Sequence, residues 1–519
     1  MTDQPSTPPS GDPGDPTAAG AYDSTRGAGD PAGAGYPAAE TMPEPKRGPG
    51  RGMVIGIGAT VLAVVAGAAV YATTALSGGG RQPDELAPKS TFAYAKFDLD
   101  PAANQKLATR EFLGKFPKLK KPANDENPFD SILEQLFEGE AISYDADVKP
   151  WFDKRAAIAG FRSTDGPTAV GILQSKDDGK ARAAMDKAVA EAKKEDEDFA
   201  YKIDDGYVVV GDTQAHVDDA VAQAKKESIE KNATFSEDVD RLDGDQVAVA
   251  WVDLRAAFDV VKGELPDAGL IPNAVTDQIK GRVVSGLHMD GDFAEVTGYM
   301  IGMEQAGQKP PAANDPTLLK GLPAGTVAAV SMNGLADTLK QGLGQLSGMG
   351  LDPEQFVGPF LQEIGLSLDD VFPLLGDQTV VSLGEVPTGP EDVAAGLLST
   401  VKDPATAKTN GTKLAAAVTQ LGVPVQADVS GNTFYLATPD YLPALKAGDG
   451  GLGKSEKFTK AMGDTGSIAA AVYVDLEAII PMLAPSDEEA ANVKALKAVG
   501  FTGGYDKGTP FFRLRVVAL

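Results

Sequence analysis

Residues 448–455 match the pattern G-x-x-x-x-G-K-S, which cradles phosphate groups in nucleotide-binding proteins. Such a loop follows a strand and opens a helix, so that backbone N–H groups and the helix start face the phosphate. A helix is expected after the loop, over 456–462, but the preceding residues 440–446 also favour a helix. We therefore interpret the glycines as a connection between two helices and predict no nucleotide site.

Two segments, 228–231 and 399–402, match S-x-x-K, which pairs a nucleophilic serine with a lysine in penicillin-binding enzymes. Those enzymes also need S-D-N and K-T-G elements, and the sequence contains neither. Ser228 is expected at the end of a helix and Ser399 at the end of a strand. The sequence also lacks G-x-S-x-G, so we predict no nucleophilic serine.

Metal ligands are suggested by four pairs of aspartates, but none continues with the third acid, glycine and distal glutamate of a calcium loop: Asp98/Asp100, Asp145/Asp147, Asp243/Asp245 and Asp290/Asp292. The two histidines, His216 and His288, have no neighbouring ligand pattern and are interpreted as structural. Trp151 and Trp251 are predicted in the core, with an aromatic carbohydrate platform at Trp151 as the alternative. We therefore predict no catalytic, cofactor-binding or metal-binding residue.

The composition restricts the classes of partner. The chain has 519 residues, a formal net charge of -27 and no cysteine. Disulfides, thiolate metal sites and cysteine nucleophiles are therefore excluded. The first 52 residues hold seven acidic and four basic side chains, which leaves 67 acidic and 43 basic residues for the rest of the chain. Such a surface repels nucleic acid and anionic lipid headgroups.

Residues 53–76 contain no charged side chain, and as a helix 54–76 would be about 34 Å long, enough to cross a hydrocarbon core. Lys46, Arg47 and Arg51 precede the segment, so the N-terminus is expected in the cytoplasm and the C-terminal part outside the plasma membrane. We favour an uncleaved anchor in the lipid bilayer over a cleaved signal peptide, because the run is long and 52 residues precede it. Small residues at helical spacing suggest a homodimer: Gly52, Gly56, Thr60, Ala59, Ala63 and Gly67.

The segments flanking the anchor have the composition of unstructured chain. Residues 1–52 are rich in proline, glycine, alanine and aspartate, which predicts a disordered cytoplasmic tail. Residues 77–90 are predicted to be a linker to the folded part. About 440 residues follow the tail and anchor, which is comfortable for two domains.

The folded part carries matching motifs that indicate a duplication. The best match is Val-Asp253-Leu against Val-Asp475-Leu. Thr91 and Thr326 are 235 residues apart, two intermediate matched pairs are 225 and 222 apart, and the last pair is 216 apart. This one-way drift is expected if the second copy has shorter loops. The sequence therefore predicts an extracellular unit over 91–304, a linker over 305–316 and a homologous unit over 317–519.

Each unit mixes the periods of strands and helices. Residues 91–98 alternate as a strand does, and 177–194 carry apolar residues at helical spacing. Paired strands are predicted over 156–162 and 168–174, and hairpins join 201–203 to 207–210 and 283–289 to 294–301. Hairpins and helices without steady β-α-β alternation predict an α+β fold, with antiparallel sheet covered by helices.

A family resemblance rests on the Leu86-Ala-Pro-Lys-Ser-Thr91-Phe-Ala-Tyr opening, the Phe97-Asp-Leu-Asp-Pro101 and Phe112-Leu-Gly-Lys-Phe-Pro117 segments, and the repeated Val-Asp-Leu. Following an apolar segment, these motifs resemble an actinobacterial envelope family known as domain of unknown function 3352. The resemblance covers about residues 86–519. It implies a membrane-anchored exterior domain and supplies no activity and no catalytic residues.

The sequence therefore favours a non-enzymatic role, binding or scaffolding in the cell envelope, with an envelope protein or a wall polymer as the partner. One alternative is an envelope hydrolase whose site is assembled only in the fold, which a converging polar pocket with buried carboxylates would favour. The other is a sensor that passes an external signal to the tail. A long groove lined by apolar or aromatic groups would favour binding.

Overall fold

The structure is a computed structural model that describes residues 81–99, 102–117, 142–264, 279–303, 313–348, 353–363, 365–387, 389, 392–466, 468–483, 486 and 493–519. The predicted tail 1–52, the predicted anchor 53–76 and most of the predicted linker 305–316 lie outside these residues. Within the described part of the chain, no helix is both long and apolar enough to cross a membrane. Below, the first half means the described residues of 81–303 and the second half those of 313–519.

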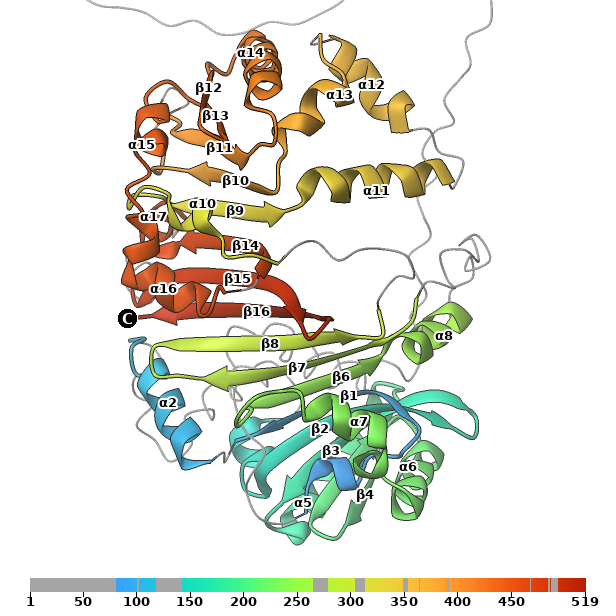
Figure 1. Cartoon of the computed structure of the whole chain (residues 1–519). Helices are drawn as coiled ribbons and strands as arrows, with labels where there is room; N and C mark the ends of the chain where they lie inside the picture. Colours follow the sequence, from blue (N-terminus) through green and yellow to red (C-terminus); the bar gives the residue numbers. More distant parts are fainter. Residues whose placement is uncertain are drawn as a thin grey trace, which may run out of the picture. The chain divides into compact units, whose positions relative to one another are not determined.

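In the described part of the chain, sixteen antiparallel strands form one sheet, which confirms the predicted α+β class with its antiparallel sheet and helices (Figure 1). From its free edge, the first half contributes strands in the order β4-β5-β3-β2-β1-β6-β7-β8. Their bounds are β1 Thr91–Asp98, β2 Phe152–Ser163, β3 Gly166–Ser175, β4 Ala200–Asp204, β5 Tyr207–Gly211, β6 Ala248–Asp253, β7 Arg282–Met289 and β8 Phe293–Ile301.

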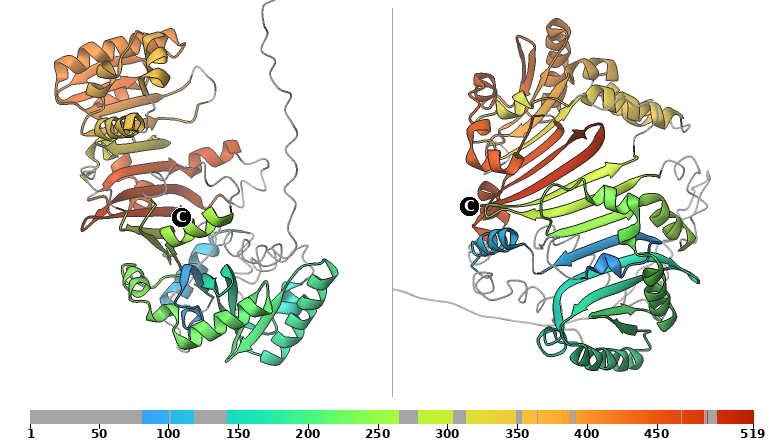
Figure 2. Two further views of the ribbon diagram at one scale, coloured as in Figure 1. Left: turned by 90° about the vertical axis from the view of Figure 1, so that its right-hand side faces the viewer. Right: turned by 60° about the horizontal axis from the view of Figure 1, so that its bottom comes forward.

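The second half repeats this strand order from the opposite edge, as β12-β13-β11-β10-β9-β14-β15-β16. The last strands of the two halves, β8 and β16, pair with each other, from Phe511↔Tyr299 to Val517↔Phe293 (Figure 2). The sheet therefore runs through the junction without a break. The bounds are β9 Ala328–Asn333, β10 Gln378–Leu383, β11 Ala395–Thr400, β12 Gln426–Ser430, β13 Thr433–Ala437, β14 Ile468–Asp475, β15 Leu496–Asp506 and β16 Thr509–Ala518.

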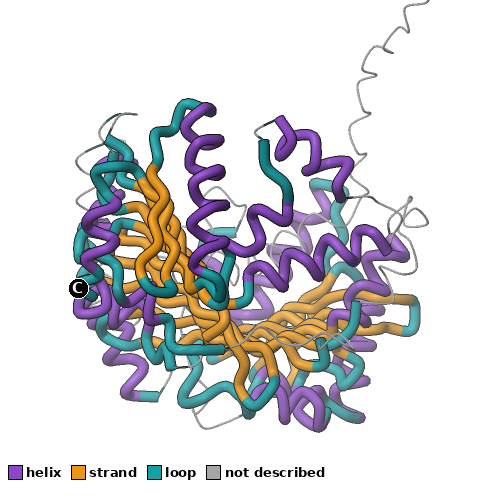
Figure 3. Tube along the Cα trace, turned by 45° about the horizontal axis from the view of Figure 1, so that its top comes forward, coloured by secondary structure: helices purple, strands orange, loops and turns teal. Residues whose placement is uncertain are grey.

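Helices lie on both sides of the sheet (Figure 3). The first half has α2 Ala103–Leu113, α5 Asp178–Lys194, α6 Gln214–Lys226, α7 Ala233–Val239 and α8 Leu254–Glu264, with short turns η1 Pro83–Glu85, η2 Tyr144–Val148 and η3 Ile229–Lys231. The second half has α10 Thr317–Lys320, α11 Leu335–Gly348, α12 Pro353–Glu363, α13 Leu368–Val371, α14 Pro404–Gln420, α15 Leu442–Ala447, α16 Glu456–Met462 and α17 Leu476–Leu483, with η5 Phe372–Leu374 and η6 Leu452–Lys454.

In both halves, an aspartate side chain caps the helix that follows the equivalent strand. Asp253 accepts a hydrogen bond from the backbone N–H of Ala256 at 3.0 Å, and Asp475 accepts one from Ala478 at 3.2 Å. Each aspartate thereby satisfies a backbone donor in the first turn of the helix that follows its strand, α8 or α17. The repeated Val-Asp-Leu motif is thus a strand end followed by a capped helix.

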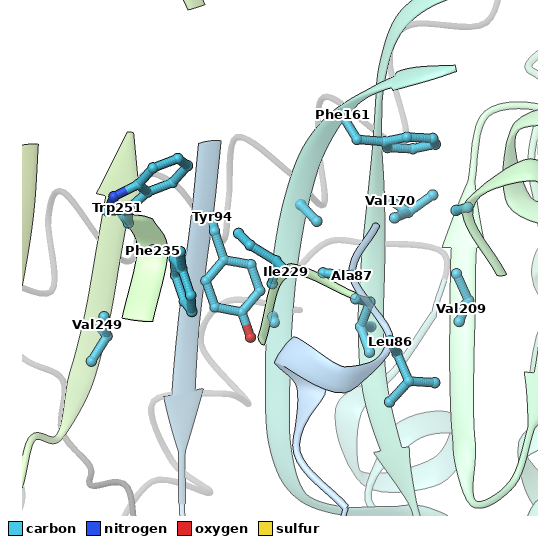
Figure 4. Packing of buried hydrophobic residues seen from close by; sticks show 14 of the residues in the cluster. Leu86, Ala87, Tyr94, Phe161, Val170, Val209, Ile229, Phe235, Val249 and Trp251 are labelled. Carbon is cyan, nitrogen blue, oxygen red and sulfur yellow. The ribbon is translucent and has the colours of Figure 1, made fainter. Parts of the chain in front are cut away.

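Each half has its own apolar core on one face of the sheet. In the first, Trp251 meets the ring of Phe235 edge to face at 5.6 Å between centroids; in the second, Tyr473 meets Phe458 in the same manner at 5.2 Å. Figure 4 shows Phe235 between Tyr94 and Trp251 in the first core. Trp151 is buried in a separate cluster, so the predicted core positions of both tryptophans are confirmed.

Part of the segment predicted as a linker, 77–90, is folded. Residues 83–85 form η1, and Leu86 and Ala87 are buried in the first core. The backbone N–H of Ile229 donates to the carbonyl of Ala87 at 2.9 Å. The segment was predicted to be a linker because prolines and charged residues surround Leu86 and Ala87. The prediction was wrong for this part, because these two apolar residues are buried in the core.

Candidate functional site

The structure places the P-loop pattern between helices, as predicted. Helix α15 ends at Ala447, and η6 and then α16 follow the glycines, so no strand leads into the loop. Lys454 donates its Nζ proton to the carbonyl of Asp449 at 2.8 Å, within the loop itself. The strand-loop-helix geometry that aims backbone N–H groups at a phosphate is therefore not formed here.

Both candidate serines have structural roles. Ser399 is fully buried on β11 and donates its hydroxyl hydrogen to the carbonyl of Leu374, whereas Lys402 is exposed and forms an ion pair with Asp377 at 3.0 Å. Ser228 is buried at the start of η3. A nucleophilic serine needs a base within hydrogen-bond reach, and the lysine of the 399–402 pattern is bound elsewhere.

The two histidines are held by local partners. His216 uses one nitrogen, Nδ1, for both Asp212 Oδ1 at 2.6 Å and Thr168 Oγ1 at 3.3 Å. A catalytic triad uses the two ring nitrogens separately, one toward the nucleophile and one toward the carboxylate, so this arrangement is not a relay. His288 Nδ1 lies 3.1 Å from the carbonyl of Asp245.

The described members of the aspartate pairs are used in ion pairs and turns, and Asp100 lies outside the described residues. Asp292, in the hairpin between β7 and β8, forms ion pairs with Lys115 at 2.7 Å and with Lys460 of the second half. Both lysines lower the pKa of the Asp292 carboxyl. Among the described residues, no group of three or more metal-ligating side chains converges. Asp292 therefore fastens the two halves together.

A buried charged cluster distinguishes the first half. Arg155 donates to Asp98 at 2.8 Å, and Lys96 donates to Asp84 at 2.6 Å; all four side chains are largely buried. Burial raises the pKa of the Asp98 carboxyl, and the bond from Arg155 opposes that rise. Burial also raises the pKa of Tyr207, whose hydroxyl donates to the carbonyl of Arg81, to about 12. These carboxylates are bonded to cations within the core.

The second half has neutral side chains at the corresponding positions. Asp98 lies opposite Arg155 in the pairing of β1 with β2, and Asn333 lies opposite Gln378 in the pairing of β9 with β10. Asn333 donates to the carbonyl of Ile468 at 2.8 Å, and Gln378 accepts from the backbone of Leu318 at 3.0 Å. The same cross-strand position therefore holds an ion pair in one half and two amides in the other.

The most unusual surface lies on the sheet face opposite the two cores. Directly paired residues of neighbouring strands point to the same face, and on six adjacent strands they form three rows across β10, β9, β14, β15, β16 and β8. We call these rows the open face. Its residues are Val381, Val330, Val472, Phe501, Leu514 and Val296; Leu383, Ala328, Val474, Val499, Val516 and Ala294; and Thr379, Met332, Ala470, Gly503, Phe512 and Gly298.

No charged residue lies in these rows, and Thr379 supplies the one polar side chain. The face is exposed to solvent on β9 and β10, where Val330 is 43% and Val381 51% exposed, while Val380, one residue away on the core face, is 0% exposed. At the junction of the halves Val516 and Ala294 are buried, and Ala294 belongs to the same cluster as Phe112. An antiparallel sheet with one face toward water normally alternates apolar and polar side chains. A continuous apolar surface of this kind marks a site of contact with another molecule.

The sequence-based interpretation missed this surface, although a signal was present. Strand β14 carries apolar residues on both faces rather than in alternation, as in the AAAVYV segment. Such a strand is expected to be covered on both faces. The sequence alone does not show that one of the two faces is left partly exposed to solvent, as it is at Val330 and Val381.

The helices that follow the equivalent strands β1 and β9 differ between the halves. In the first half, α2 follows β1 and buries Phe112 and Leu113 against Leu287 and Ala294. In the second half, α11 follows β9 (Figure 1). It has no buried residue, and Leu339 and Leu346 on it are exposed. The second half therefore leaves its central strands accessible.

Comparison with known proteins places the chain in a family. The family model described as "Protein of unknown function (DUF3352)" matches residues 55–434, most of the chain, and the chain belongs to this family. No curated protein and no solved structure matches it.

Proposed function

We propose that this protein is a non-enzymatic binding protein of the cell envelope, held in the plasma membrane by residues 53–76, with residues 1–52 in the cytoplasm and the sheet outside. The observation that carries the proposal is the open face, an apolar surface that is exposed to solvent on β9 and β10 at Val330 and Val381. Covering each half-exposed valine contributes on the order of 1 kcal/mol to binding, so the surface favours a partner of matching apolarity.

The two halves are, in this proposal, tandem homologous units joined edge to edge. The matching strand order and the matching capping aspartates Asp253 and Asp475 support a duplication. The pairing of β8 with β16 then joins the sheets of the two units into one.

An envelope hydrolase is the weaker candidate. The buried carboxylates Asp98 and Asp238 are bonded to Arg155 and Arg282, and Trp251 Nε1 also donates to Asp238 at 2.9 Å. A general base needs a carboxylate that can reach a substrate, whereas these groups neutralise arginines inside the core.

The orientation in the membrane can be tested with single cysteines, because the natural sequence has none. We expect a membrane-impermeant maleimide to label the Leu421→Cys variant in intact cells and to leave the Ser10→Cys variant unlabelled until the cells are lysed. Leu421 is 57% exposed and lies outside the open face. Labelling of Ser10→Cys in intact cells, or protection of Leu421→Cys, would overturn the proposed topology.

Binding by the open face can be tested in cells with a photo-crosslinking amino acid at Val330 of the full-length protein, and with the same amino acid at Leu421 as the control. We expect the same envelope component to be captured repeatedly from position 330 and not from position 421. Equal capture from the two positions would show that the open face has no binding role.

A further inference from the structure

We propose that α11 closes over the open face of the second half, as α2 covers the equivalent part of the first half, and thereby controls access to that face. This inference rests on the proposed function and names its regulation. In the structure, α11 extends beyond the end of β9 and has no buried residue (Figure 1). This is the open state, and the closed state is the less populated one in the free protein.

The two hairpins that end the halves define equivalent positions. Asp290 begins the turn between β7 and β8, and Asp506 begins the turn between β15 and β16. Counting away from these turns on both strands matches one cross-strand pair of each hairpin with one of the other. The matched pairs are Leu287↔Val296 with Gly503↔Phe512, and Met289↔Ala294 with Tyr505↔Pro510.

Helix α2 covers these positions in the first half. Leu287, Met289 and Ala294 are 6%, 3% and 6% exposed, and they lie in one cluster with Phe112 of α2. Their three equivalents in the second half are all partly exposed. The second half therefore has the surface on which α2 packs in the first half, but there the surface is left without its helix.

Helix α11 has the pattern and the length to cover this surface. Leu335, Leu339, Leu343 and Leu346 follow one another at helical spacing and lie on one side of the helix. From β9 to β16 there are three strand steps, about 14 Å, and the 14 residues of α11 extend about 21 Å. Leu343 lies about 13 Å from Gly334 along the helix, which places it over β15 and β16 in the closed state.

The joint between β9 and α11 is a single glycine. Gly334 has a φ of +62°, and an added Cβ would have no atom within 4 Å. Glycine adopts positive and negative φ with similar ease, so the helix can change direction here without strain. Closure breaks the contact of Lys340 Nζ with the ring of Phe372, which is 4.9 Å from Nζ to the centroid. Such a contact is weak at an exposed site.

Closure hides part of the surface on which the proposed partner binds. Neighbouring rows of the open face are two residues apart along the strands, about 7 Å, and a helix is about 10 Å across. Helix α11 on the row of Gly503 and Phe512 therefore overhangs the central row, which contains Val330 and Val381. A partner on the central row binds the open state and shifts the population toward it.

The test traps the closed state with a disulfide in the full-length protein, which has no natural cysteine. We expect the Leu343→Cys/Gly503→Cys variant in membranes to form an intramolecular disulfide under mild oxidation. The matched control is Gln341→Cys/Gly503→Cys, which places the cysteine on the opposite side of α11 and should react at least tenfold more slowly. An added Cβ at Gly503 has its nearest neighbour at 3.7 Å, and Leu343→Cys/Tyr505→Cys is a second trap if that variant does not fold.

The outcomes separate this inference from the proposed function. Equal rates in the two variants, or a disulfide between two chains, would overturn closure of α11 over its own sheet. If the disulfide forms, capture by the photo-crosslinker at position 330 should fall at least tenfold and return after reduction. Unchanged capture in the oxidised protein would overturn the control of access. A disulfide without any capture from position 330, oxidised or reduced, would leave closure in place and overturn the binding role.

Discussion

The two halves have the same strand order, but they differ in what they bury. At one cross-strand position the first half holds Asp98 and Arg155, an ion pair inside the core, where the second half holds Asn333 and Gln378. The first half also packs α2 against its sheet, whereas α11 in the second half is exposed. The strand order therefore does not depend on these side chains. The first half buries an ion pair and covers its sheet with α2, whereas the second half has exposed apolar side chains on β9 and β10.

The largest effect is expected from breaking the ion pair of the first half. Arg155→Gln removes the nearest positive charge from the buried Asp98 carboxylate and should lower the free energy of unfolding by about 3–5 kcal/mol at pH 7. Because the pKa of Asp98 is already raised by burial, the loss should shrink as the pH falls through that pKa and the carboxyl becomes neutral. Denaturant unfolding at several pH values measures this.

The double variant Asp98→Asn/Arg155→Gln copies the second half into the first and is the matched control. Replacing both charges by amides should cost less than the single change, because no unpaired charge stays buried. If the double variant is no more stable than Arg155→Gln, the ion pair is not the reason for the difference.

A second, comparable effect is expected from the helices that follow β1 and β9. Phe112→Ala empties a buried position of α2 and should cost about 3–5 kcal/mol. Leu339→Ala on α11 removes an exposed side chain and should change stability by no more than about 0.5 kcal/mol. Thermal unfolding of both variants measures the contrast, and a large loss in Leu339→Ala would show that α11 packs against something in solution.

The smallest effect is expected at the junction. Asp292→Asn removes ion pairs to Lys115 and Lys460, but the side chain is partly solvated, so the loss should stay below about 1 kcal/mol at pH 7. The lysines lower the pKa of Asp292, so this contribution exists above the ordinary pKa of about 3.9 and disappears as the pH falls through the lowered value. Melting temperatures of the variant and the natural protein should therefore converge in acid. A constant difference would assign the effect to packing instead.

Local signals were sufficient to predict much of the fold. Residues 91–98 form β1, the predicted hairpin over 283–289 and 294–301 is formed by β7 and β8, and α5 begins directly after its capping residue Asp177. The Val-Asp-Leu motif also predicted equivalent places in the two halves. These features depend on residues close together in the chain, so alternation, turn residues and caps report them.

The candidate site depends on information that the sequence does not display. Asp98 and Arg155 are 57 positions apart, and their contact follows from the register of two strands. In the sequence, an exposed apolar face of a sheet has the same pattern as a covered one. The sequence does not show that α11, which follows β9, has no buried residue. Leucines at helical spacing predict an amphipathic α11 and leave its packing partner undetermined.

The pairing of β8 with β16 also affects how the protein is made. Strand β16 spans Thr509–Ala518, whereas its neighbour β8 ends at Ile301. During synthesis, β8 is complete more than 200 residues before its neighbour exists, and until then it is a bare sheet edge that can pair with other chains. Because β16 covers this edge, deletion of residues 509–518 would remove the seam between the halves and expose the edges of β8 and β15 at once.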